Sequence, residues 1–436
     1  MKTTTQSIAR TGSMIMSWRR GAVAVTLIAL AAGACDTKVT NPGPVQDNFL
    51  DEPTAQVAVI AGMGRALSEG MNFIVYTGAA ITREIHPAGS TGSFGITVPW
   101  QQGVLDPLDE NLDTHWEQAQ QARWYAENGV ARMKTVIPDS ARLLAQANLW
   151  AGYANRLLGD NMCEAVFDGG PAEPYTKYYE RAETYFTTAS TLGTGDVKTA
   201  AIAGRASARA GLGKWAEAVA DAGQVPTGFT FNMPYYDVGD QGQFNRIEFA
   251  AHNQPYRAHT MWSTWIDAYY TATSDPRVKF DKTTLTGDAG INCCGSSSFR
   301  APFYPQAKYT TPSSPVTLSQ GAEMRLIEAE NDLRAGNAQT ALTRINALRA
   351  AAGVPDATGT TTAEVWTALK RERAIVLWME GRRLGDLRRW KAGNTPGALD
   401  PLEEPSGNVN TGSHLVKQDL CFPISRSERD TNPNIS

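Results

Sequence analysis

The residues that come closest to a catalytic motif are Gly211, Gly213 and Lys214, which partly resemble a phosphate-binding loop. A loop of that kind also needs a glycine further upstream and a Ser or Thr after the lysine to contact the metal, and Trp215 takes that place. The five histidines and five cysteines of the 436-residue chain lack the spacing of metal ligands. We therefore expect no catalytic residue, no metal and no cofactor.

Aromatic side chains are concentrated in the middle of the chain, which favours non-covalent binding over catalysis. Sixteen of them lie between Phe229 and Tyr309. Over residues 226–316 the helical periodicity of the neighbouring sequence is lost, and Pro, Gly, Ser and Asn become frequent. So long a segment without regular periodicity, inside a helical protein, usually carries function. We expect an irregular subdomain that rests on a helical scaffold.

The scaffold is predicted from apolar residues at helical spacing. Two segments resemble each other at a shift of 123 residues, which sets Gly213 on Gly336 and Ala206 on Ala329. Small residues and a glycine between two short helices are typical of tetratricopeptide-type hairpins, although alanine-rich helices also align by chance. Further helical runs are expected over residues 53–86, 106–136, 141–158 and 175–192.

The most distinctive stretch is residues 364–390, EVWTALKRERAIVLWMEGRRLGDLRRW. Its charge pattern alone predicts a solvated pair of helices with i,i+3 and i,i+4 ion pairs. Pro423, Glu428 and the pair Asn432-Pro433 in the tail, together with this stretch, resemble the C-terminal signature of the SusD/RagB family. The matching positions of the stretch, which we expect to be structural, are Glu372, Arg373, Glu380, Gly381, Arg383, Asp386 and Trp390.

The resemblance implies a fold, a location and a partner. SusD-like proteins are surface lipoproteins that are built on four tetratricopeptide-type units and bind nutrients for TonB-dependent outer-membrane transporters. For this chain the family implies a mostly α-helical protein with a tetratricopeptide-like helical-hairpin scaffold and an irregular, loop-rich central subdomain. It also implies an oligosaccharide or similar nutrient as the ligand and a SusC-like transporter as the partner.

Candidate binding residues come from the loops after the first helix and from the central segment, where ligand sites of the family lie. Flat aromatic faces pack against the C–H surfaces of sugar rings, and amides, carboxylates and guanidinium groups bind the hydroxyls. Core packing is the competing explanation for each aromatic residue. The candidates are Arg83, Glu84, Trp100, Trp262, Trp265, Tyr269 and Tyr270, with Asn253 and Asp267 as further polar partners.

The N-terminus indicates export. Arg19 and Arg20 precede an apolar run over residues 21–34, which is too short to span a bilayer and ends in small residues before Cys35. This order predicts a lipoprotein signal peptide over residues 1–34 and a lipid anchor on Cys35, with simple secretion as the alternative. We expect a lipid-anchored protein of the outer membrane that faces outward.

Without residues 1–34 the net charge falls from −4 to about −8, which argues against nucleic-acid binding.

Four further cysteines are available for disulfides, which an exported chain permits. They are Cys163, Cys293, Cys294 and Cys421. Adjacent Cα atoms lie about 3.8 Å apart, below the roughly 4.4 Å that is the usual lower limit for a disulfide. We therefore expect Cys293 and Cys294 to bond to Cys163 or Cys421 and not to each other.

The expected organisation is one domain behind a tether. Two other functions remain open: a helical-repeat scaffold that binds proteins in the cell envelope, and an envelope glycoside hydrolase. Binding that depends on the central aromatics favours the nutrient receptor, and binding in the concave face of the repeats favours the scaffold. The expected boundaries are 1–34 for the signal peptide, 35–52 for the tether, and 53–436 for the SusD-like domain, with its scaffold at 53–225 and 317–392, its ligand-binding subdomain at 226–316 and its tail at 393–436.

Overall fold

A computed structural model describes residues 47–239, 242–252, 256–408, 410 and 414–435. The chain divides into two units, Met1–Leu50 and Asp51–Ser436, and the architecture below is that of the second unit. The predicted signal peptide, the tether up to residue 46, Cys35 and Asn253 lie outside the described residues.

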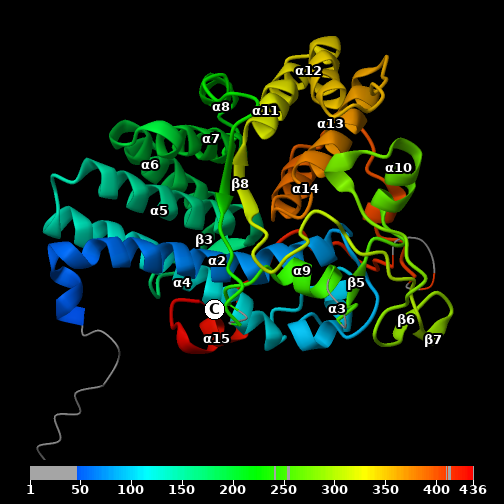
Figure 1. The fold of residues 1–436 in the computed structure, drawn as a ribbon, viewed down its shortest axis with the longest axis horizontal. Helices are drawn as coiled ribbons and strands as arrows, with labels where there is room; N and C mark the ends of the chain where they lie inside the picture. Colours follow the sequence, from blue (N-terminus) through cyan, green and yellow to red (C-terminus); the bar gives the residue numbers. More distant parts are fainter. Residues whose placement is uncertain (1–46, 240–241, 253–255, 409, 411–413, 436) are drawn as a thin grey trace, which may run out of the picture. The chain divides into compact units, whose positions relative to one another are not determined.

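The first half of the unit is a series of helices in which each packs against the next (Figure 1). Each of the four helical runs predicted for this half is present. The first ends at Ile81, earlier than predicted, because Arg83 has left-handed backbone with φ +60°. The helices are α2 (Gln56–Ile81), α4 (Asn111–Val136), α5 (Ala141–Asn161), α6 (Thr176–Leu192), α7 (Gly195–Gly211) and α8 (Trp215–Ala222).

Three neighbouring helices interlock through residues spaced seven apart, which is about two helical turns. Tyr179 and Phe186 of α6 face glycines of α5 and α7. A Cβ atom added at Gly152 of α5 would lie 2.6 Å from the Phe186 ring, and one added at Gly204 of α7 would meet the same ring. A Cβ atom at Gly211 would lie 2.6 Å from the Tyr179 ring. The glycines therefore let α6 approach both neighbours closely.

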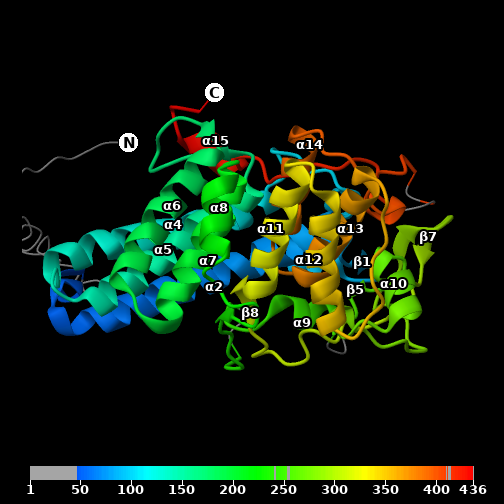
Figure 2. The same ribbon diagram turned by 90° about the horizontal axis from the view of Figure 1, so that it is seen from above.

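A second group of helices completes the scaffold. Gly213 and Gly336 have left-handed backbone, with φ +74° and +82°, and each lies in the turn between two helices. This confirms the repeated helix hairpin predicted at the shift of 123 residues. Figure 2 shows α11, α12 and α13 side by side. The group consists of α11 (Gly321–Arg334), α12 (Ala338–Ala351), α13 (Thr362–Val376) and α14 (Arg383–Ala392).

The central segment contains short elements that are joined by loops. They are β4 (Thr230–Met233), α9 (Arg246–Ala251), β5 (His259–Thr260), α10 (Trp265–Thr273), η4 (Pro276–Val278), β6 (Ile291–Cys293) and β7 (Ser296–Phe299). The sheets are antiparallel pairs: β1 (His86–Pro87) with β5, β2 (Glu164–Ala165) with β3 (Glu173–Pro174), β4 with β8 (Val316–Gln320), and β6 with β7.

Short helical turns and one helix near the C-terminus make up the rest. They are η1 (Asp47–Asp51), η2 (Pro53–Ala55), η3 (Thr91–Phe94), α3 (Val98–Gln101), η5 (Pro401–Glu403) and α15 (Arg426–Thr431). Across the described part of the chain, none of the helices combines the length and the apolar character needed to cross a bilayer.

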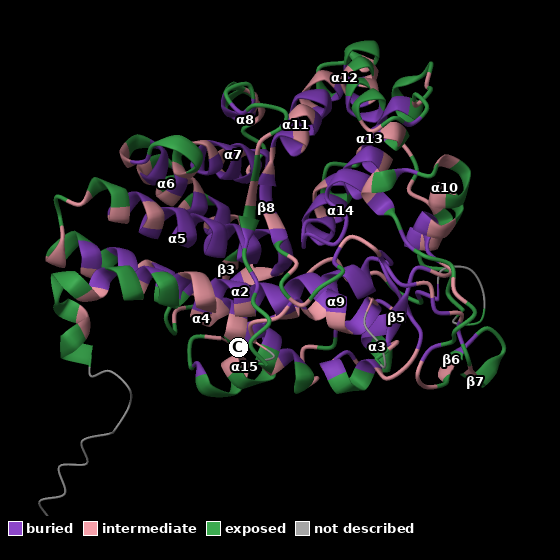
Figure 3. Cartoon of the chain, in the orientation of Figure 1, coloured by how far each residue is buried: buried purple, intermediate pink, exposed green. Residues whose placement is uncertain are grey.

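The charged stretch 364–390 is buried, in contrast to the solvated helix pair that its charge pattern predicts. Figure 3 shows most of α14 in the colour of buried residues. Glu372 is 0% exposed, and its carboxylate pairs with Arg349 of α12 at 3.1 Å. Arg373 is 3% exposed and pairs with Asp386, thirteen residues on, at 2.8 Å. Most of these ion pairs therefore join different elements and not neighbouring turns of one helix.

Other charges of this stretch reach the rest of the scaffold. Arg382 pairs with Asp160 of α5 at 2.8 Å and with Glu323 of α11 at 3.0 Å. Glu380 pairs with Lys308 of the central segment at 2.7 Å. Removing one partner of a buried pair leaves an uncompensated charge in the interior. These contacts make the stretch a junction between the two helical groups and the central segment.

The cysteines pair differently from the sequence prediction. Cys163, which follows α5, is bonded to Cys421 in the tail, with Cα atoms 4.9 Å apart. Cys293 and Cys294 are bonded to each other, with Cα atoms 3.8 Å apart. The prediction was wrong because it considered the Cα separation alone. Cys294 has left-handed backbone, φ +59°, at the turn between β6 and β7, and this conformation lets the neighbouring side chains meet.

Candidate ligand-binding surface

Four of the residues predicted to contact ligand lie in the interior. Trp100 and Arg83 are 0% exposed, and Trp265 and Glu84 are 1% exposed. The carboxylate of Glu84 accepts a hydrogen bond from the backbone N–H of Met379 at 2.8 Å, and burial raises the pKa of Glu84 to about 7. These four side chains therefore pack the core and present no face to a dissolved ligand, in contrast to the sequence prediction.

Tyr269 and Tyr270 of α10 are half-buried. The hydroxyl of Tyr269 donates to Asp275 at 2.8 Å and accepts from Nη1 of Arg349 at 3.2 Å. The Tyr269 side chain also lines a hollow of about 540 Å³ beside the loop before α13. Asp267 forms an ion pair with a lysine at 3.1 Å. These contacts hold α10 against its neighbours.

Trp262 is half-buried and lies two residues after the end of β5, whose pairing with β1 holds this part of the chain in place. Its backbone N–H donates to Oγ1 of Thr260 at 3.1 Å. The indole ring meets His86 edge-on, with ring centroids 5.2 Å apart, and lies 5.5 Å from the ring of Phe299 in β7. His86 in turn lies 5.6 Å from His414 of the tail. Residues from distant parts of the chain thus gather beside one tryptophan.

The loops that meet here contain no Asp, Glu, Lys or Arg. They are residues 85–105, 289–299 and 405–416, and we call their described residues, with Trp262, the three-loop surface. The backbone N–H of Val416 donates to the carbonyl oxygen of Gln102 at 3.0 Å, which joins the first loop to the third. Charged side chains lie at its edges: the backbone N–H of Ser90 donates to Oδ1 of Asp288 at 2.8 Å, and Arg300, directly after the second loop, is exposed. The loops themselves are rich in hydroxyls and amides, which suit a polar ligand.

His86 and His259, two histidines near Trp262, do not supply a charge at neutral pH. Burial lowers the pKa of His86 well below its ordinary value, and the nearby Arg83 lowers it further. Burial lowers the pKa of His259 to about 3. Nδ1 of His259 is hydrogen-bonded to the hydroxyl of Tyr76 at 2.7 Å. His86 and His259 therefore act as neutral packing and hydrogen-bonding groups.

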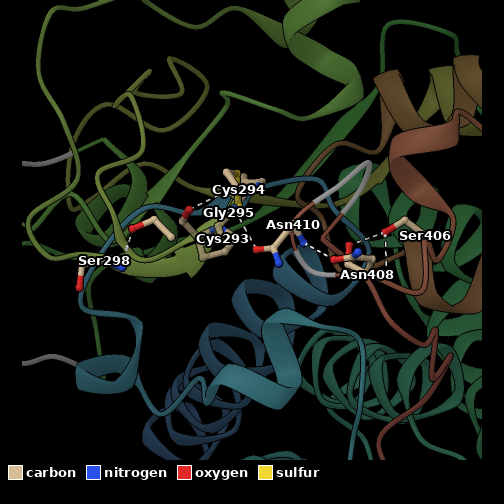
Figure 4. The surroundings of a disulfide bond; sticks show 10 residues. Cys293, Cys294, Gly295, Ser298, Ser406, Asn408 and Asn410 are labelled. Carbon is tan, nitrogen blue, oxygen red and sulfur yellow. Dashed lines mark hydrogen bonds between the residues drawn. A yellow bond between two sulfur atoms is a disulfide. The ribbon is translucent and has the colours of Figure 1, made fainter.

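The β6–β7 hairpin contributes the bonded pair Cys293–Cys294, and Asn410 of the third loop faces this turn (Figure 4). The backbone N–H of Gly295 donates to Oδ1 of Asn410 at 3.0 Å. The backbone N–H of Asn410 donates to Oδ1 of Asn408 at 2.9 Å. Figure 4 shows the Asn410 side chain pointing toward the turn. Sequence reasoning missed this contact, because its partners lie 115 residues apart and no local pattern in either loop indicates the other.

A second aromatic surface lies elsewhere, on α4. Trp124 and Tyr125 are 47% and 50% exposed, and their rings lie edge to face at 5.3 Å. They line a hollow of about 510 Å³ between α4 and α15, together with Glu117, Asp168 and Glu428.

Among the described residues, no group of three or more His, Cys, Asp or Glu side chains is arranged to hold a metal ion.

Comparison with known proteins connects this architecture to one family. Residues 321–436 match the model of the SusD family. No curated protein sequence matches the chain. The crystal structure of a SusD superfamily protein from Parabacteroides distasonis is similar to this chain, with a TM-score of 0.67 at 12% identity over 88% of this chain and 98% of the other.

Two proteins of Bacteroides vulgatus are also similar in structure. One is a SusD superfamily protein, with a TM-score of 0.63 at 15% identity over 88% of this chain and 98% of the other. The second is a SusD-like carbohydrate binding protein, with a TM-score of 0.58 at 14% identity over 86% of this chain and 97% of the other. At these identities the likeness shows the fold alone. Residues 321–436 thus carry the sequence pattern of the SusD family, and the chain as a whole has the SusD fold.

Proposed function

We propose that this protein binds a neutral oligosaccharide at the three-loop surface, without cleaving it, and delivers it to a TonB-dependent outer-membrane transporter. The observation that carries the proposal is the meeting of three uncharged loops beside the half-buried Trp262. The matching family model and the similarity to a SusD-like carbohydrate binding protein support it.

The chemistry of the surface favours a sugar over other ligands. Sugar rings present C–H faces that pack on aromatic rings, while their hydroxyls need donors and acceptors around the rim. Trp262 and Phe299 provide the ring surfaces, and Asn408 and Asn410 provide exposed amides. The loops themselves offer no charged side chain that would replace the hydration of a ligand with many charges.

Lipid anchoring through Cys35 belongs to the same proposal. It is supported by Arg19 and Arg20, the short apolar run and the small residues before the cysteine. An anchored receptor can stay beside a transporter and pass on ligand after each capture. Weak binding suits that role, because about micromolar to millimolar dissociation constants, roughly 8 to 4 kcal/mol, permit release.

Titration calorimetry against a panel of oligosaccharides tests ligand binding. We expect at least one of cellohexaose, xylohexaose and mannohexaose to bind, and oligogalacturonate, which is charged, to bind more weakly. Trp262→Ala should weaken binding about tenfold or more, because truncating a stacking aromatic removes much of the contact energy. Trp124→Ala is the matched control, since Trp124 is exposed on α4 outside the three-loop surface.

The other outcomes point to other functions. Equal weakening by Trp124→Ala would move the site to the hollow on α4. Failure of every oligosaccharide to bind, together with no transporter co-purifying from solubilised envelopes, would contradict the proposal and favour a protein-binding scaffold. Release of shorter sugars from the oligosaccharides would instead indicate a glycoside hydrolase.

A further inference from the structure

One member of the bonded pair Cys293–Cys294 is buried and the other is exposed. Cys293 is 2% exposed, whereas Cys294 and Gly295 are exposed. Cys294 and Gly295 both have left-handed backbone, with φ +59° and +87°. That conformation is uncommon for a residue other than glycine. The covalent bond between neighbours therefore holds a turn that a free chain would rarely adopt.

This turn positions one loop of the three-loop surface against another. The N–H of Gly295 donates to Oδ1 of Asn410 at 3.0 Å, and the N–H of Asn410 donates to Oδ1 of Asn408 at 2.9 Å (Figure 4). The N–H of Gly295 points at Asn410 because the backbone on either side of it is left-handed. The disulfide thus helps to set where the amide groups of the third loop lie.

The same hairpin also carries an aromatic ring of the surface. Ile291 pairs with Phe299, and Cys293 pairs with Ser296 nearer the turn. The ring of Phe299 lies 5.5 Å from that of Trp262. Two residues along a strand span roughly 7 Å. The disulfide and Phe299 therefore belong to the same short hairpin, and Phe299 links that hairpin to Trp262.

We propose that the Cys293–Cys294 disulfide is itself a ligand contact. Its exposed member, Cys294, offers a polarisable sulfur and a methylene group, which pack against the C–H face of a sugar ring of a neutral oligosaccharide. Exposed hydroxyl and amide groups surround it and bind the ring hydroxyls; they belong to Asn292, Ser296, Ser297, Ser298 and Asn410. The inference rests on the proposed function and extends the site from Trp262 to the hairpin turn.

The first test replaces both cysteines, Cys293→Ala with Cys294→Ala, so that no free thiol remains. The probe is whichever of cellohexaose, xylohexaose and mannohexaose binds the unmodified full-length protein most tightly. We expect the dissociation constant to rise about tenfold or more. The control is the double change Cys163→Ala with Cys421→Ala, which removes the other disulfide, outside the three-loop surface. It should lower the melting temperature and leave the dissociation constant within about twofold.

A second variant keeps both cysteines. Asn410→Ala removes the acceptor of the Gly295 N–H, and we expect it to weaken binding of the same probe several-fold; Asn128→Ala, an exposed amide on α4, should not. If the double-alanine variant does not fold, the double-serine variant, Cys293→Ser with Cys294→Ser, decides in its place, because Asn410 is itself a ligand-binding amide in the proposed function. Unchanged affinity in both variants would refute the role of the disulfide and leave the proposed function standing. If none of the three hexasaccharides binds the unmodified protein, the proposed function fails and this inference fails with it.

Discussion

Arg373 donates two hydrogen bonds to the carboxylate of Asp386, each 2.8 Å long, and so joins α13 to α14. Arg389 donates a third at 2.8 Å. Burial alone would raise the pKa of Asp386, but Arg373 and Arg389 outweigh it and lower the pKa to about 2. This pair is the centre of the family signature, and its partners lie in the protein interior.

Changing Asp386→Ala should strongly destabilise the fold, because it leaves Arg373 buried without its counter-charge. We expect a loss of about 3–5 kcal/mol in the free energy of unfolding, measured by urea denaturation. Asp430→Ala is the matched control, because Asp430 is 66% exposed and its pair with Arg426 is worth about 1 kcal/mol or less. An Asp386→Ala variant that unfolds like the control but no longer binds oligosaccharide would show that the signature serves binding.

The stability of the protein should depend on pH through Glu84. Burial raises the pKa of Glu84 to about 7, against about 4.3 in an unfolded chain. Between these values the folded state keeps a proton that the unfolded state has released, so the free energy of unfolding falls as pH rises from about 4.5 to 7. We expect a decrease on the order of 2–3 kcal/mol between pH 5 and pH 8. Glu84→Gln should remove this decrease, and an unchanged slope in the variant would count against the buried carboxyl as its source.

Changing two helix glycines to alanine should have opposite effects on stability, because Gly204 of α7 lies against α6 whereas Gly62 of α2 faces open space. Gly204→Ala places a methyl group against the Phe186 ring, and we expect a loss of about 1–3 kcal/mol. In Gly62→Ala the new Cβ atom meets nothing within 4 Å, on the exposed side of α2. That change should stabilise the protein by about 0.5–1 kcal/mol, because alanine favours helix over glycine. Thermal or chemical unfolding of the two variants measures both, and a neutral Gly204→Ala would mean that α6 can shift.

The two disulfides should differ in their effect on stability. The Cys163–Cys421 bond joins residues 258 apart in sequence, whereas Cys293–Cys294 joins neighbours. Removing the first should cost about 4–5 kcal/mol, because the long loop it closes gains conformational freedom in the unfolded state. Removing the second should change the free energy of unfolding much less. Guanidinium unfolding of the two double-alanine variants compares them, and equal losses would contradict a loop-closure origin.

Membrane attachment depends on Cys35 in the proposed function. Cys35→Ser should release the protein from the membrane fraction of the cell, since a stable lipid anchor needs acyl chains on that residue. Fractionation with immunodetection measures this, and the loss of radiolabelled fatty acid from the protein provides an independent check. A serine variant that stays in the membrane fraction after cleavage of its signal would rule out Cys35 as the anchor.

The sequence by itself determined the helical scaffold, because the pattern that predicts a helix is local. The runs that became α4, α5 and α6 show apolar residues at helical spacing, and Gly213 and Gly336 mark equivalent turns. The signature around Asp386 was also recognisable, since it depends on residue types at fixed spacing. Local patterns predict which residues share one face of a helix. They do not predict which of two neighbouring aromatic side chains is buried when the helices and loops pack together.

Only the tertiary structure decided the candidate site. Trp262 and Trp265 are three residues apart with similar neighbours, yet Trp262 stays half-buried and Trp265 is 1% exposed. The contact between Gly295 and Asn410 spans 115 residues, and nothing in either loop specifies the other. The cysteine pairing likewise depended on one left-handed residue, Cys294, and on the tail returning to the end of α5. Such contacts form when distant segments pack together, so their partners are set by the whole fold and not by local spacing.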